Sequence, residues 1–191
     1  MALGRTCTLN PLQQSEKRLM TQRSGMWVGN NEHPVQADML TVGQPAPDFQ
    51  LIQSSDMSVK TLADFGKAVK VISCVPSLDT RVCAAQTKRF HNEMESFGEG
   101  VIVLTVSADL PFAQNRWCGA EGVTRTLTLS DHKTMTFADA YGVHDTAWRV
   151  TQRAAFVLDG DNVLHYVEYM DKIGDEINFE AILNKVRELL A

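Results

Sequence analysis

The strongest structural signal in the chain is the sequence KAVKVISCV, residues 67–75, followed by PSLDTRVC, residues 76–83. The first stretch is rich in β-branched residues and predicts a strand that ends at Pro76. The second stretch contains three residues that commonly cap helices, and beyond it apolar side chains recur at helical spacing as far as Gly98. Residues 101–106 (VIVLTV) are continuously apolar, which is typical of a strand buried on both faces of a sheet. Together these stretches predict a strand–helix–strand unit.

Further elements are expected along the rest of the chain. A helical segment is expected at residues 110–122, a short strand at 126–129 and a short helix at 135–141. Two strands, at 154–158 and 163–169, are joined by the turn DGDN, and an amphipathic helix follows at 178–190. A βαβ unit followed by ββα is similar to the thioredoxin-like layout. The predicted fold class is therefore α/β, with a central mixed sheet flanked by helices.

The first 38 residues are polar and weakly patterned, so we interpret residues 1–38 as an N-terminal extension of a domain that spans residues 39–191. Turn-forming residues favour a hairpin near residues 26–40. Residues 1–19 are interpreted as disordered, or as non-native sequence if Met20 is the true start.

The composition is that of an ordinary globular protein, with 44% hydrophobic and 21% charged residues in a chain of 191. A net charge of −5 argues against nucleic acid as a partner, because nucleic-acid binders usually carry a basic face. No apolar run approaches the roughly 20 residues of a membrane span, and the N-terminus lacks the apolar stretch of a secretory signal. A transit peptide is a minor alternative, since the segment is poor in acidic residues. We therefore expect a soluble, cytoplasmic protein.

The chain contains four cysteines, Cys7, Cys74, Cys83 and Cys118, which are too few for a secreted disulfide scaffold. No two of them have the close spacing of a zinc site, and the histidines show no metal-like spacing either. Each cysteine is therefore a buried inert thiol or a reactive one. In a reducing compartment any disulfide between them would be transient.

Cys83 is the best candidate for a reactive thiol, because the predicted pattern places it in the first turn of a helix. The first amides of a helix have no internal partners, and the helix dipole adds partial positive charge there. Both effects favour the thiolate, which is the nucleophilic form of cysteine. The alternative, considered on this position alone, is a small buried hydrophobic residue beneath a helix cap.

The octet PSLDTRVC resembles the active-site motif of peroxiredoxins, Pro-x-x-x-Thr/Ser-x-x-Cys, and most closely that of the thiol peroxidases, an atypical two-cysteine subfamily. Three further segments resemble that subfamily: SADLPFAQ at 107–114, RWCGAEG at 116–122 and TLS at 128–130. The resemblance spans roughly residues 42–191. It implies a thioredoxin-like fold and an enzyme that reduces alkyl hydroperoxides and hydrogen peroxide.

The resemblance also implies roles for individual residues. Cys83 matches the peroxidatic cysteine, and Pro76 matches the proline that shields its sulfenic acid. Thr80 matches the hydroxyl that binds the thiolate and the peroxide. Arg153, in the sequence TQRA, matches the arginine that faces the sulfur, where a fixed positive charge stabilises negative charge.

Cys118 matches the resolving cysteine of the subfamily, which converts the sulfenic acid into an intramolecular disulfide. Two cysteines on different helices rarely come within the roughly 7 Å between Cα atoms that a disulfide needs. We therefore expect local unwinding around Cys118, where Gly119 and Gly122 favour melting. The resemblance implies thioredoxin as the reductant and a homodimer. The chemistry needs no metal or other cofactor.

Two cysteines and two other functions remain as alternatives. Cys74 is interpreted as an inert core thiol, with a role as resolving thiol left open, and Cys7 has no assigned role. The chain could instead be a thioredoxin-fold redox sensor or disulfide relay protein, although it lacks the Cys-x-x-Cys of a disulfide exchanger. A non-catalytic, chaperone-like dimer is a third reading, in which Cys83 is dispensable.

Overall fold

The computed structural model describes residues 22–93 and 97–191. Cys7, Met20 and the interpretation of residues 1–19 therefore lie outside the described residues. Within them, the main sheet has the strand order β11–β10–β5–β6–β7–β3–β4. Its strands are β3 (Leu51–Gln53), β4 (Val59–Lys60), β5 (Val69–Cys74), β6 (Val101–Ser107), β7 (Thr126–Ser130), β10 (Ala154–Leu158) and β11 (Leu164–Tyr169).

Strand direction makes this sheet mixed, as predicted. Strands β5, β6 and β7 are parallel, whereas β10 and β3 pair with their neighbours in the antiparallel direction. Because β5 and β6 lie in the middle of the sheet, their side chains are buried almost throughout. This burial explains why residues 101–106 are continuously apolar rather than alternating.

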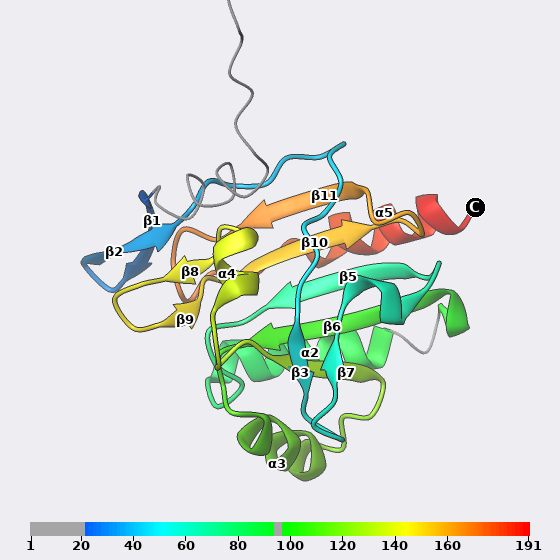
Figure 1. Cartoon of the computed structure of the whole chain (residues 1–191), viewed down its shortest axis with the longest axis horizontal. Helices are drawn as coiled ribbons and strands as arrows, with labels where there is room; N and C mark the ends of the chain where they lie inside the picture. Colours follow the sequence, from blue (N-terminus) through cyan, green and yellow to red (C-terminus); the bar gives the residue numbers. More distant parts are fainter. Residues whose placement is uncertain (1–21, 94–96) are drawn as a thin grey trace, which may run out of the picture.

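Helices cover both faces of the sheet (Figure 1). They are α2 (Arg81–Glu93), α3 (Pro111–Glu121), α4 (Thr136–Ala140) and α5 (Phe179–Leu190), with short 3-10 turns η1 (Leu62–Phe65) and η3 (Gly98–Gly100). Successive residues of a strand point to opposite faces. Val71 accordingly packs in a core cluster with residues of α2 and α5, while Ile72 packs in a second cluster with Phe137 of α4. The expected strand–helix–strand unit corresponds to β5, α2 and β6.

A second sheet of four strands joins the N-terminal segment to the rest of the domain. Strands β1 (Gln22–Val28) and β2 (Asn31–Gln36) form an antiparallel hairpin, and β2 pairs with β8 (His144–Asp145), which pairs with β9 (Val150–Thr151). The buried side chains of His33 and Asp145 lie 2.7 Å apart and connect the hairpin to β8. The hairpin is therefore packed into the fold rather than attached to its surface.

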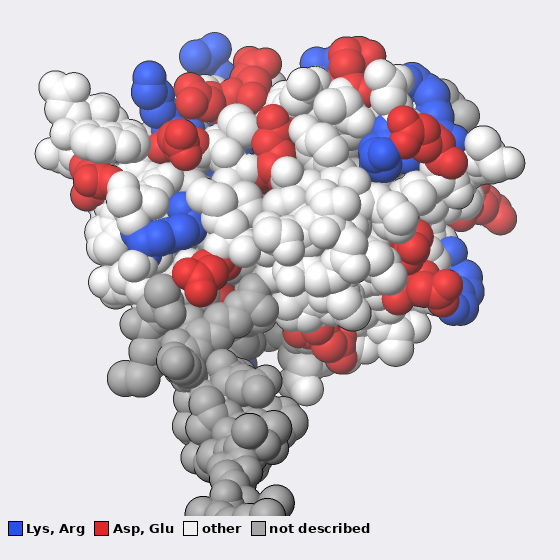
Figure 2. All heavy atoms as spheres, turned by 90° about the horizontal axis from the view of Figure 1, so that it is seen from above, with Lys and Arg blue, Asp and Glu red and all other residues white. Residues whose placement is uncertain are grey.

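On the face shown in Figure 2, acidic and basic side chains are intermingled. None of the helices in the described ranges combines the length and the apolar character that a membrane span requires.

Candidate active site

Cys83 lies in the first turn of α2, just after the turn that follows β5. Its side chain is completely buried in a small cluster with Val75, Leu78 and Trp117. Because α2 begins at Arg81, the sulfur sits where the helix amides have no partners within the helix. The strand, the turn and the helix together bring Cys83 to the carboxyl-terminal edge of the parallel strands.

Arg153 is the charged group that contacts Cys83. Its Nη2 lies 3.3 Å from Cys83 Sγ and 3.0 Å from the carbonyl oxygen of Ile173, to which it donates. Nη1 donates to Gln86 Oε1 at 2.7 Å, and Gln86 Nε2 donates in turn to Ser73 Oγ at 2.7 Å. The arginine is 1% exposed, and its Nε is buried with no hydrogen-bond partner among the described residues. The guanidinium is thus fixed by its partners beside the sulfur of Cys83.

Thr80 and Pro76 shape the turn around the sulfur. The Thr80 hydroxyl donates to the carbonyl oxygen of Ser77 at 3.0 Å, and the Thr80 amide donates to the same oxygen at 3.1 Å. In this conformation the hydroxyl therefore closes the turn, and no hydrogen bond joins it to Cys83 Sγ. Pro76 is buried directly after β5, and the preceding carbonyl, of Val75, accepts a hydrogen bond from the Thr151 hydroxyl at 2.6 Å.

Asp109 anchors this turn from the end of β6. Its carboxylate accepts hydrogen bonds of 2.8 Å from the hydroxyls of Ser77 and Ser107 and from the amide of Leu78. The role of Asp109 was not predicted, although the residue lies in the SADLPFAQ segment that carries the resemblance. The contact of Gln86 with Arg153 depends on tertiary packing, and no sequence motif indicates it.

Cys118 lies in α3 and belongs to the same apolar cluster as Cys83. Both thiols are free in this conformation. Cys118 is half-buried, its sulfur lies 3.5 Å from Thr128 Oγ1, and burial raises the pKa of its thiol. A cavity of about 390 Å³ opens beside it. The structure thus brings Cys83, Cys118, Thr80, Pro76 and Arg153 to one region.

Comparison with known proteins identifies the family of the chain. The family model described as the AhpC/TSA family matches residues 42–167. The chain belongs to the AhpC/TSA family. It is 48% identical over 150 residues to the thiol peroxidase of Streptococcus pneumoniae (strain ATCC BAA-255 / R6), covering 78% of this chain and 91% of that protein. It is 44% identical over 149 residues to the thiol peroxidase of Bacillus subtilis (strain 168), covering 78% and 88% of the two chains.

Solved structures extend this comparison to the fold. The crystal structure of a peroxiredoxin-like protein from Aquifex aeolicus superposes with a TM-score of 0.79 at 33% identity, covering 88% of this chain and 98% of the other. The predicted thioredoxin-like fold is confirmed, and this AhpC/TSA member is a thiol-dependent peroxidase. The alternative of a redox sensor or disulfide relay is not favoured.

Cys74 occupies a different environment from the other two cysteines. It packs with Leu104 and Tyr141 in the core cluster on the α4 side of the sheet, whereas its neighbour Ser73 faces Gln86 of α2. Complete burial raises the pKa of the Cys74 thiol well above its ordinary value. Cys74 and Cys83 therefore lie in different core clusters, with the side chain of Cys74 on the face of β5 that points away from α2. This placement favours the interpretation of Cys74 as an inert core thiol.

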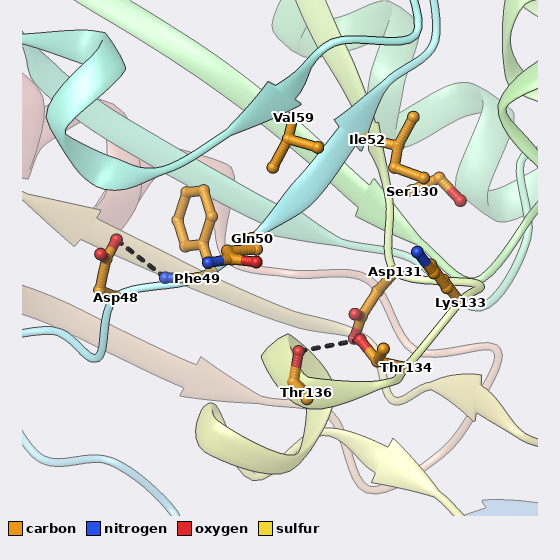
Figure 3. Close-up of a pocket in the computed structure, with 10 residues that line it drawn as sticks. All are labelled: Asp48, Phe49, Gln50, Ile52, Val59, Ser130, Asp131, Lys133, Thr134 and Thr136. Carbon is orange, nitrogen blue, oxygen red and sulfur yellow. Dashed lines mark hydrogen bonds between the residues drawn. The ribbon is translucent and has the colours of Figure 1, made fainter.

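A cavity of about 450 Å³ lies apart from the cysteines, between β3, β7 and α4. Figure 3 shows Phe49 on one side of it and the side chains of Asp131 and Lys133 on the other. None of the predicted site residues lines this cavity, so it takes no part in the chemistry considered below.

Proposed function

We propose that this peroxidase works through Cys83 and Cys118. The Cys83 thiolate attacks the distal oxygen of a hydroperoxide, the O–O bond breaks, and the products are Cys83 sulfenic acid and an alkoxide that takes a proton to become the alcohol. The single observation that supports this assignment best is the 3.3 Å contact between Arg153 Nη2 and Cys83 Sγ. A buried guanidinium in this place stabilises both the thiolate and the charge that develops on the leaving oxygen.

The second step forms the intramolecular disulfide. The Cys118 thiol attacks the sulfenic sulfur of Cys83, the S–O bond breaks, and water leaves. Cys118 must first leave α3, because the two thiols sit on separate helices. The sequence of α3 supports such a movement, since Gly119 lies within the helix next to Cys118, and a glycine inside a helix lowers its stability by roughly 0.5–1 kcal/mol relative to alanine.

The third step regenerates the enzyme. We propose that a thioredoxin dithiol reduces the Cys83–Cys118 disulfide by thiol–disulfide exchange and is itself oxidised to a disulfide. A cytoplasmic location fits this cycle, because the cytoplasm keeps such dithiols reduced.

Cysteine variants test the assignment. Consumption of cumene hydroperoxide should be followed with thioredoxin, thioredoxin reductase and NADPH. Cys83→Ser should abolish consumption altogether. Cys118→Ser should consume about one equivalent, because Cys83 is still oxidised once, and then stop turning over with thioredoxin. Undiminished turnover by Cys83→Ser would remove Cys83 from the mechanism.

We also propose that the enzyme is a homodimer that buries the apolar surface beside the active site. Phe112, at the start of α3, is 70% exposed, and Leu110, two residues before it, is also exposed. Leu110 directly follows Asp109, the anchor of the active-site turn. Large exposed apolar side chains that lie next to one another mark surfaces that bind another protein. Phe112→Glu should halve the mass measured by light scattering, and a monomeric wild-type protein would contradict the proposal.

A further inference from the structure

The N-terminal hairpin of β1 and β2 has no role in the chemistry above, yet it is connected to the arginine of the site. Strand β1 contains a register shift between Ser24 and Met26, which leaves Gly25 as a bulge. Bulges next to active sites redirect groups of the chain. Here the Gly25 carbonyl accepts a hydrogen bond of 2.7 Å from Gln152 Nε2. The bulge thus connects the hairpin to the residue that precedes Arg153.

Gln152 joins three segments of the chain. Its side chain is completely buried. Besides its bond to Gly25, Nε2 donates to the Met170 carbonyl at 2.8 Å, and Oε1 accepts a hydrogen bond from the guanidinium of Arg23 in β1. Burying an amide is unfavourable unless its polar atoms find partners. These contacts explain why glutamine is accommodated in the core at this position.

A second connection runs through residues 171–173, which follow β11. The Trp27 amide donates to the Asp171 carbonyl at 2.6 Å, and the Ile173 amide donates to the Trp27 carbonyl at 3.0 Å. The Ile173 carbonyl in turn accepts the 3.0 Å hydrogen bond from Arg153 Nη2, the nitrogen that also contacts Cys83 Sγ. Strand β1 therefore fixes the segment that contains Ile173, and the carbonyl oxygen of Ile173 accepts a hydrogen bond from the guanidinium of Arg153.

We propose that the hairpin is a brace for the active site, with Gln152 and Ile173 as positioning residues that keep Arg153 against Cys83. This inference rests on the role of Arg153 in the proposed function. An arginine side chain has many rotamers, and only fixed partners give it one orientation. One such partner, Gln86, belongs to α2, and the other, Ile173, lies in a segment that is paired with β1.

Two variants weaken the brace from different sides. Gln152→Leu removes all the contacts of the amide. Arg23→Met removes the guanidinium at the half-buried edge of β1, with its hydrogen bonds to Gln152 Oε1 and to the Gly142 carbonyl and its contact with the Tyr169 ring, but leaves the Gln152 bonds to Gly25 and Met170 in place. It tests the brace if Gln152→Leu fails to fold. Ser24→Ala is the matched control, because Ser24 lies in the same strand and its exposed hydroxyl bonds Glu32 instead.

The readouts are the single-turnover rate of Cys83 oxidation by cumene hydroperoxide and the rate of Cys83 alkylation by iodoacetamide at neutral pH, followed by peptide mass. A misplacement of roughly 1 Å at a reacting centre can cost about 100-fold in rate, and because Gln86 still holds Nη1 we expect a loss of about tenfold for Gln152→Leu. The loss for Arg23→Met should be smaller. Ser24→Ala should match wild type, and circular dichroism should show an intact fold.

A double-mutant cycle with Arg153→Met decides whether the brace acts through the arginine. Gln152→Leu or Arg23→Met should slow the wild type but cause little further loss once Arg153 is replaced. Equal losses in both backgrounds, or wild-type rates for both brace variants, would overturn the inference. If Arg153→Met itself reacted at the wild-type rate, the proposed function would be at fault rather than the brace alone.

Discussion

At the scale of single residues, Asp131 is a buried carboxyl group whose surroundings oppose its charge. Its Oδ2 accepts a hydrogen bond of 2.8 Å from the Ala138 amide, but Oδ1 has no partner among the described residues. Burial raises the pKa of Asp131 to about 6, although the backbone hydrogen bonds at the start of α4 act in the opposite direction. The carboxylate form therefore costs folding stability.

Asp131→Asn should change how stability depends on pH. The unfolded carboxyl has a pKa of about 3.9, so between pH 4 and 6 the folded protein binds more protons and wild-type stability falls as pH rises. The asparagine variant lacks this loss. The difference in unfolding free energy between the variant and wild type should therefore increase, in favour of the variant, by about 2 kcal/mol between pH 4 and pH 7.5. Urea titrations at the two pH values measure it.

The exposed Asp175→Asn variant controls for the loss of a surface charge. The same difference between Asp131→Asn and wild type at both pH values would show that Asp131 ionises normally in the folded protein.

At the scale of elements, α3 is attached to the sheet by apolar packing and also by the hydrogen bonds of a buried glutamine. Its buried residues are Pro111, Gln114 and Trp117. Gln114 Nε2 donates to Ser107 Oγ at 2.9 Å and to the Leu129 carbonyl at 3.0 Å, while its Oε1 is buried without a partner among the described residues. Water can replace these hydrogen bonds when the helix detaches, so α3 is suited to releasing Cys118.

Gln114→Ala should therefore favour the detached state of α3. Losing a buried hydrogen bond costs about 1 kcal/mol, which corresponds to an increase of about fivefold in the population of detached helix. Disulfide formation should become faster, and less Cys83 should be over-oxidised to sulfinic acid per turnover. Hydrogen exchange of α3 and the mass of the Cys83 peptide measure both effects.

Asn115→Ala, at the neighbouring exposed position of α3, is the control for helix propensity. Greater over-oxidation in Gln114→Ala than in this control would show that the polar contacts do not limit the release of Cys118.

The helices and strands that carry the site could be predicted from the sequence because their signals are local. Strand β5, helix α2 and strand β6 follow from residues 67–106 alone, and Cys83 is placed by its position in the first helical turn. The two-residue strands β8 and β9 have too few residues for any periodicity. The contact of Arg153 with the Ile173 carbonyl depends on the backbone geometry of a loop. The pattern of side chains in the sequence does not indicate that geometry.

At the scale of the whole molecule, chain folding brings together segments that are far apart in sequence. Strand β2 pairs with β8, and Arg153 reaches Cys83 across the end of the main sheet. Motif resemblance could name Cys83, Cys118 and Arg153, but it could not reveal that the N-terminal hairpin contacts Gln152 and the segment that follows β11, both of which lie beside Arg153. Long-range pairings of this kind are set by tertiary packing rather than by local sequence.

The proposed cycle requires that Cys83 is oxidised by peroxide and then joined to Cys118. The measurement is a count of free thiols in reduced protein before and after one equivalent of cumene hydroperoxide, with the disulfide mapped by peptide mass. We predict the loss of two thiols within seconds and a single Cys83–Cys118 peptide. A Cys83–Cys74 link would contradict the assignment of the resolving cysteine, and no loss of thiols on that timescale would contradict the cycle itself.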